Sequence, residues 1–147
     1  MLPKTHGIFG VIFALILINF FGFSDIAGLV VFLSSVLIDV DHYLQILFSS
    51  GEISLRRAYN SHVSKRNAFR TLNSRDKGTY KHKHFVFHGI EFIIILWTLS
   101  FLSIVFYWVL LGVVFHLLLD YIDIFLHRGS FMAKFSQVGL WVRNKKG

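Results

Sequence analysis

Residues 92–119 decide the fold, because they read FIIILWTLSFLSIVFYWVLLGVVFHLLL and contain no Asp, Glu, Lys or Arg. With its flanks the stretch covers residues 84–126, which would make one helix of about 65 Å at 1.5 Å per residue. A bilayer core is only about 30 Å thick, so one span does not accommodate this length. We therefore expect two antiparallel helices, over 84–100 and 104–127, joined by a tight turn at residues 100–103.

Two further apolar runs precede this region. The first predicts a helix over 6–23 and contains no Asp, Glu, Lys or Arg. The second begins at residue 26, and its helix is expected to continue through a polar segment to residue 48. The sequence thus predicts an all-α, multi-pass membrane protein of about four antiparallel transmembrane helices, forming a single domain over residues 1–147.

The composition supports a membrane protein. Hydrophobic residues make up 54% of the chain and charged residues 16%, whereas soluble domains contain about 25% charged residues. The chain has no Cys, which excludes a disulfide framework, a thiolate zinc site and a Cys nucleophile.

The basic residues indicate an orientation. All 15 Lys and Arg residues precede the first predicted helix, follow the last, or lie between the second and third. They are Lys4; then Arg56, Arg57, Lys65, Arg66, Arg70, Arg75, Lys77, Lys81 and Lys83; then Arg128, Lys134, Arg143, Lys145 and Lys146. Because cytoplasmic flanks collect Lys and Arg, we expect an inner-membrane protein with both termini and the loop over 49–83 in the cytoplasm.

The basic loop carries an apolar pattern of its own. Its apolar and aromatic positions recur at roughly helical spacing: Leu55, Ala58, Tyr59, His62, Val63 and Phe69. This pattern predicts either a short helix lying on the anionic leaflet or a solvated positive-inside loop. The net charge of +7 makes anionic lipid headgroups the expected partners, and no nucleic acid is expected. Four short spans make a small bundle, which is compatible with a homo-oligomer.

Histidines and acidic residues gather at the same end of the predicted bundle. They are His6, Asp39, Asp41, His42, His82, His84, His88, Glu91, His116, Asp120, Asp123 and His127. The opposite end offers only Asp25. Positive-inside bias does not explain this difference, because acidic residues contribute little to that rule.

Spacing places several of these side chains on shared helix faces. His116 and Asp120 are four residues apart, as are His84 and His88, so each pair can converge on one point. A divalent cation would neutralise clustered carboxylates, and imidazoles supply nitrogen donors. We therefore expect a shared metal site. Its first expected ligands are Asp39, His42, His88, His116 and Asp120, and the next are His6, Asp41 and His84.

The donor types narrow the choice of metal. Histidine with carboxylates and without Cys suits Zn²⁺ first, with Mn²⁺ or Fe²⁺ as alternatives. Asp41 lies off the face shared by Asp39 and His42, so it is expected either to bind a second metal or to orient a ligand.

Four short pieces of sequence combine these residues with particular neighbours. They are Thr5-His6 followed by Gly10, LIDVDH at 37–42, HKHFVFH at 82–88, and Gly112 followed by HLLLD at 116–120. Together they resemble the membrane-bound metal-dependent hydrolase family of small multi-pass proteins. That family usually has His-Arg, a short gap and Thr-His-Ser in the third piece. Here Lys83 replaces Arg, and either His82 or His84 is the first imidazole.

The resemblance implies metal-dependent hydrolysis, since the family is distantly similar to helical zinc phospholipases and nucleases. A divalent ion lowers the pKa of bound water from about 15.7 towards 7 and polarises a phosphoryl or acyl oxygen. Asp41 or Glu91 is the expected general base. We expect a phosphoester substrate such as a lipid headgroup, with an amide or ester second. Two alternatives stay open: a non-catalytic protein with a structural metal site, and an ion- or proton-conducting transport protein.

Overall fold

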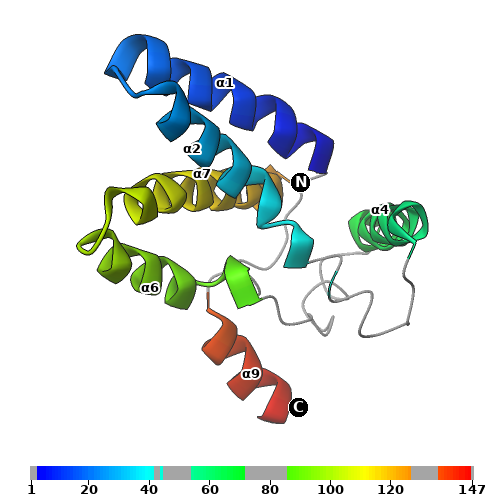
Figure 1. Ribbon diagram of the computed structural model, residues 1–147. Coiled ribbons are helices and arrows are strands. Elements are labelled where there is room, and N and C mark those ends of the chain that lie inside the picture. The colour runs from blue at the N-terminus through cyan, green and yellow to red at the C-terminus, as the bar shows by residue number, and fades with distance from the viewer. Residues whose placement is uncertain (1–2, 42–43, 45–53, 72–85, 127–135, 147) are drawn as a thin grey trace.

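The computed structural model describes residues 3–41, 44, 54–71, 86–126 and 136–146. Within these ranges the chain is all-α, as predicted. Its elements are α1 (Pro3–Phe21), α2 (Asp25–Leu37), α4 (Leu55–Thr71), the 3₁₀ helix η1 (Val86–His88), α6 (Ile90–Ser100), α7 (Ile104–Leu126) and α9 (Gln137–Lys146) (Figure 1).

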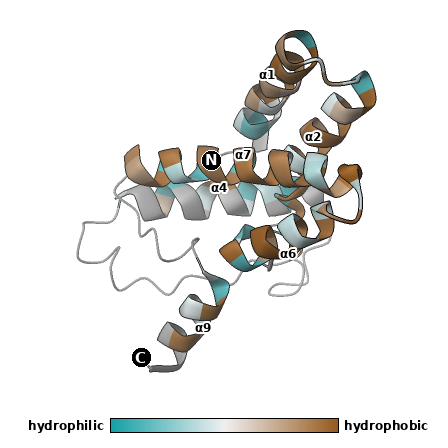
Figure 2. Cartoon of the chain, turned by 90° about the vertical axis from the view of Figure 1, so that its left-hand side faces the viewer, coloured by the Kyte–Doolittle hydropathy of each residue, from teal (hydrophilic) through white to brown (hydrophobic). Residues whose placement is uncertain are grey.

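Two of the helices are long and apolar enough to cross a membrane, by length and composition. They are the Lys4–Phe21 part of α1 and the whole of α7. The other two predicted spans correspond to α2 and α6, which are apolar but only 13 and 11 residues long. Large hydrophobic side chains lie exposed on α1 and α7, and Figure 2 shows hydrophobic residues predominating along α6 and α7. Exposed apolar helix faces of this kind are typical of surfaces that contact lipid.

The two turns remote from the histidines follow from local sequence. Gly22 adopts a φ of 70°, a left-handed conformation that glycine tolerates without steric cost. Ser24 then caps α2, because its Oγ accepts a hydrogen bond from the Ala27 N–H at 3.2 Å. The predicted turn at residues 100–103 is confirmed, with the Leu102 N–H donating to the Leu99 carbonyl at 2.9 Å.

The second predicted helix ends earlier than expected. A turn at residues 38–39 interrupts the helix that was predicted to run over 26–48. The Asp39 N–H donates to the Val36 carbonyl at 3.2 Å, three residues back, instead of bonding to the carbonyl of Ser35 as a regular α-helix requires. Helical structure returns at residues 40–41. The prediction of one continuous helix is therefore wrong at this turn, and its far end lies outside the described residues.

Helix α2 packs against α7 at the centre of the molecule, with α1 on α2 and α6 on α7. Small residues allow this close approach. A Cβ at Gly112 would overlap the Ser34 hydroxyl and the Val31 carbonyl, and one at Gly10 would lie 2.5 Å from the Ser35 hydroxyl oxygen. Small residues at such positions let membrane helices approach closely. The α2–α7 contact thus fixes where the polar side chains of α7 lie along the bundle.

Helices α4 and α9 lie outside this packed group of four helices. The sequence pattern left two alternatives for the basic loop, a short helix or a solvated loop, and the structure has a helix there, α4. Its placement on a lipid leaflet stays a prediction. The sequence analysis predicted no element at residues 137–146, where the structure has α9.

Candidate metal centre

Four segments bring ionisable side chains to one end of the bundle. His6 comes from the first turns of α1, Asp39 and Asp41 from the turn after α2, and His88 from the end of η1. His116 and Asp120 lie on the second half of α7. The relative exposure is 0% for His88 and His116, 1% for His6, 2% for Asp120 and 6% for Asp41. Burial of ionisable groups at this density requires strong compensating interactions.

His116 has a defined tautomer. Its Nδ1 lies 2.7 Å from the Ser35 carbonyl oxygen, which only accepts hydrogen bonds, so Nδ1 carries the proton. That carbonyl is available because the Asp39 N–H bonds to Val36 instead. The Nε2 of His116 faces Asp120 Oδ2 at 3.5 Å and Asp39 Oδ1 at 3.7 Å. A backbone carbonyl that orients a histidine in this way is a common feature of metal sites.

His88 lies between three carboxylates. Its Nδ1 is 3.5 Å from Asp41 Oδ2, and the same oxygen accepts a 2.7 Å hydrogen bond from the Phe87 N–H. On the other side of the ring, Nε2 lies 3.9 Å from Asp120 Oδ2 and 4.0 Å from Asp39 Oδ1. Asp41 therefore contacts the outer nitrogen of His88, whereas Asp39 and Asp120 face the inner one.

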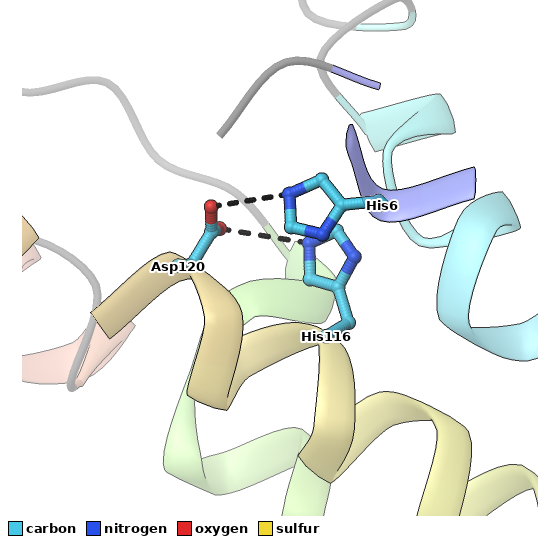
Figure 3. Close-up of side chains that lie close together, drawn as sticks. All are labelled: His6, His116 and Asp120. Carbon is cyan, nitrogen blue, oxygen red and sulfur yellow. Dashed lines mark ion pairs between the residues drawn. The ribbon is translucent and has the colours of Figure 1, made fainter. Parts of the chain in front are cut away.

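His6 lies near the other oxygen of the Asp120 carboxylate. Its Nε2 lies 3.4 Å from Asp120 Oδ1, and its ring stacks on that of His116 with centroids 3.9 Å apart and planes 19° from parallel (Figure 3). The two oxygens of Asp120 thus face different imidazoles, Oδ1 facing His6 and Oδ2 facing His88 and His116.

The spacing of these donors fits a cation. Four atoms, Asp39 Oδ1, His88 Nε2, His116 Nε2 and Asp120 Oδ2, are separated by 3.5–4.0 Å across the four imidazole–carboxylate pairs. Hydrogen bonds between such groups would be about 2.7–3.2 Å long. Ligands bound 2.0–2.2 Å from a tetrahedral ion lie about 3.4 Å apart.

The buried nitrogens of two imidazoles are a second indication that the cluster could hold a cation. Within the described residues, His116 Nε2 and both ring nitrogens of His6 are buried without a hydrogen-bond partner. Leaving such nitrogens unsatisfied costs about 1–3 kcal/mol each, and Nε2 of His116 faces oxygens of two closely spaced carboxylates. A divalent cation among these atoms would resolve both problems, so the residues present fit a metal ion.

The predicted metal ligands differ in where the structure places them. The structure brings together five of the eight predicted metal ligands in two groups that share His116. One group is His6, His116 and Asp120, and the other is Asp39, His88 and His116. Asp41 is adjacent to them, behind His88. The other two predicted ligands, His42 and His84, lie outside the described residues, so their role stays a prediction.

Glu91, a predicted general base, makes its described contacts with the start of α9. Its Oε1 accepts hydrogen bonds from the Ser136 hydroxyl at 2.6 Å and the Val138 N–H at 3.2 Å, and its Oε2 accepts one from the Gln137 N–H at 3.2 Å. These bonds satisfy amide groups that a helix N-terminus leaves unpaired. The structure therefore gives Glu91 a capping role, and its role as a base stays a prediction.

Ser35 is a functional residue that the sequence reasoning missed. It acts through its backbone carbonyl on His116, so its side-chain type gives no direct signal. Two indirect signals were present, the small residues Gly10 and Gly112 on neighbouring helices, which approach Ser35 in the structure.

The comparisons with known proteins add no further constraint: no family model, curated protein or solved structure matches the chain. The fold and the cluster define an all-α protein with two helices apolar enough to cross a membrane and a group of buried His and Asp side chains that could hold a metal ion.

Proposed function

We propose that this chain is a membrane-embedded, metal-dependent hydrolase acting on a phosphoester, such as a lipid headgroup. The observation that carries the proposal is the convergence of Asp39, His88, His116 and Asp120, which approach from α2, η1 and α7 with metal-like separations. The motif resemblance to membrane-bound metal-dependent hydrolases points to the same class. Zinc is the first choice of ion, because histidine and carboxylate donors without thiolates suit it.

The residues of the cluster have different roles in this proposal. When bound, a divalent ion supplies Lewis acidity and lowers the pKa of water that it contacts. The Ser35 carbonyl and Asp41 fix the outer nitrogens of His116 and His88, which keeps both inner nitrogens directed at the donor cluster. Asp41 is favoured over Glu91 as the proton acceptor, because Asp41 contacts His88 whereas Glu91 caps α9.

The surroundings support a lipid or another anionic phosphoester as the substrate. The cluster lies at the start of α1 and in the second half of α7, the two helices that are long and apolar enough to cross a membrane. The chain carries 15 basic and 8 acidic residues, and α4 alone contains Arg56, Arg57, Lys65, Arg66 and Arg70. Basic segments beside membrane helices attract anionic headgroups. We therefore place the cluster at the cytoplasmic leaflet, in accordance with the positive-inside rule.

A second candidate function is a structural metal site without catalysis. The burial of His88 and His116 favours it, because structural metal sites are closed whereas catalytic ones keep an open coordination position.

Metal analysis and a turnover screen on the purified chain in detergent separate these proposals. We expect bound zinc or manganese, its loss in His116→Ala, and hydrolysis of a phosphodiester, phosphomonoester or ester by the wild-type chain only. Bound metal without turnover of any of these substrates would favour the structural site. An unchanged metal content in both His116→Ala and Asp39→Ala would reject the shared site altogether.

A further inference from the structure

The proposed four-donor centre leaves one buried imidazole unused. His6 is almost completely buried, and within the described residues neither of its ring nitrogens has a hydrogen-bond partner. Its Nε2 lies 3.4 Å from Asp120 Oδ1, whereas the four-donor centre uses the other oxygen of that carboxylate. His6 therefore requires a ligand that the first centre does not provide.

The stacking of His6 on His116 argues against one ion shared by both rings. A metal–imidazole bond follows the nitrogen lone pair, which lies in the ring plane, and is about 2.0–2.1 Å long. Because the two ring planes are only 19° from parallel and their centroids are 3.9 Å apart, the rings are stacked, and an ion lying in the plane of one ring lies away from the plane of the other. Their lone pairs do not meet at bonding distance from a single ion.

His88 provides the contrasting case within the same cluster. Its ring meets that of His116 edge-on, at 78° between planes and 5.2 Å between centroids. Lone pairs from two rings at this angle can converge, and both inner nitrogens lie near Asp39 Oδ1 and Asp120 Oδ2. The geometry thus pairs His116 with His88 on one ion and separates His6 from them.

We propose that the cluster holds two divalent cations bridged by the Asp120 carboxylate. The first is bound by Asp39, His88, His116 and Asp120 Oδ2, and the second by His6 Nε2 and Asp120 Oδ1. The 3.9 Å between the stacked rings agrees with the roughly 3.5–4 Å that separates the ions of two-metal hydrolytic sites.

The second cation deepens the proposed function and rests on it. The described residues give it two donor atoms, so within this part of the chain its remaining positions would be available to water and to oxygen atoms of an anionic substrate. Paired ions of this kind clamp the oxygens of a phosphoryl group during in-line displacement. The pair therefore favours a phosphoester over an amide or ester as the substrate class.

Manganese titration of the full-length chain in detergent or nanodiscs tests the pair. Elemental analysis counts Mn²⁺ per chain, and electron paramagnetic resonance distinguishes magnetically coupled ions from isolated ones. The variants are His6→Gln, which removes the imidazole donor of the second site, and the control Gly7→Ala, whose added Cβ meets no atom within 4 Å.

We expect two coupled ions in the wild type and in Gly7→Ala, and one uncoupled ion in His6→Gln. A single ion in both the wild type and His6→Gln would overturn the second site while leaving a one-metal hydrolase intact. Two ions retained in His6→Gln would overturn the role of His6, and so would the loss of both. No ion in the wild type would overturn the proposed function as well. If His6→Gln does not fold, the wild-type ion count and coupling still decide the matter.

Discussion

The two ends of the helix bundle satisfy their polar groups in different ways. At the end with the turns at residues 22–24 and 101–103, serine hydroxyls bond to backbone groups close in sequence: Ser24 caps α2, and Ser103 Oγ accepts from the Val105 N–H at 3.3 Å. At the other end, side chains from α1, α2, η1 and α7 face one another across long sequence separations. Local hydrogen bonds satisfy the polar groups of the first end, whereas the second end leaves buried nitrogens of His6 and His116 without a hydrogen-bond partner among the described residues.

The largest expected effect comes from His116→Ala, which removes a donor that faces both Asp39 and Asp120. Loss of a group that hydrogen-bonds to and orients a metal-bound histidine costs about 10–100-fold in metal affinity, so we expect loss of a direct ligand to cost at least 100-fold and to abolish hydrolysis. Elemental analysis and a phosphoester assay measure the two effects. Ser103→Ala, at the opposite end, is the control and should keep both. Equal metal content in the two variants would contradict the difference between the ends.

Removal of the metal by a chelator tests whether an ion at the cluster stabilises the protein. A ligand that binds only the native state stabilises it, so a chelator should lower the melting temperature of the wild-type chain. The same chelator should leave the melting temperature of His116→Ala unchanged. A chelator-induced decrease of equal size in both proteins would place the stabilising ion elsewhere.

Gly112→Val tests the packing that joins the two ends. Its new side chain would collide with the Ser34 hydroxyl and the Val31 carbonyl, which should force α2 and α7 apart. Overpacking of this kind costs about 1–3 kcal/mol, and we expect a lower melting temperature together with weaker metal binding. Gly7→Ala, in open space, should change neither property. A stable Gly112→Val with full metal affinity would show that the close approach does not position His116.

Asp41→Asn tests whether the orientation of His88 matters for metal binding when all the metal ligands are still present. The change keeps all four donors of the first centre but weakens the contact that holds His88 Nδ1. We expect a 10–100-fold weaker metal affinity, as for other carboxylates that orient metal-bound histidines. Asp25→Asn, the matched change at the opposite end, should leave the affinity unaltered. A larger loss than that in His116→Ala would instead identify Asp41 as a direct ligand.

The sequence predicted the fold class and one end of the molecule better than it predicted the cluster. Apolar run lengths fixed α1 and α7, and the turn at residues 100–103 followed from the impossibility of a single helix across 84–126. Spacing on α7 placed His116 and Asp120 correctly on one face. The early end of α2 was missed, because the tight turn at residues 38–39 leaves the Ser35 carbonyl free to accept the hydrogen bond from His116, a requirement that no local pattern encodes. The capping of α9 by Glu91 was missed for the same reason.

The smallest effect is expected for Ser24→Ala, at the end that local sequence completes. The change removes the hydroxyl that accepts from the Ala27 N–H, and the loss of such a cap costs about 1 kcal/mol. Ser24→Gly should cost only a few tenths of a kcal/mol, because glycine is itself tolerated at this position. Thermal unfolding measures the two costs, and elemental analysis should find the metal content unchanged in both variants. A loss of metal in Ser24→Ala would mean that the two ends are energetically coupled through α2, and the cluster would then depend on the whole bundle rather than on the contacts at its own end.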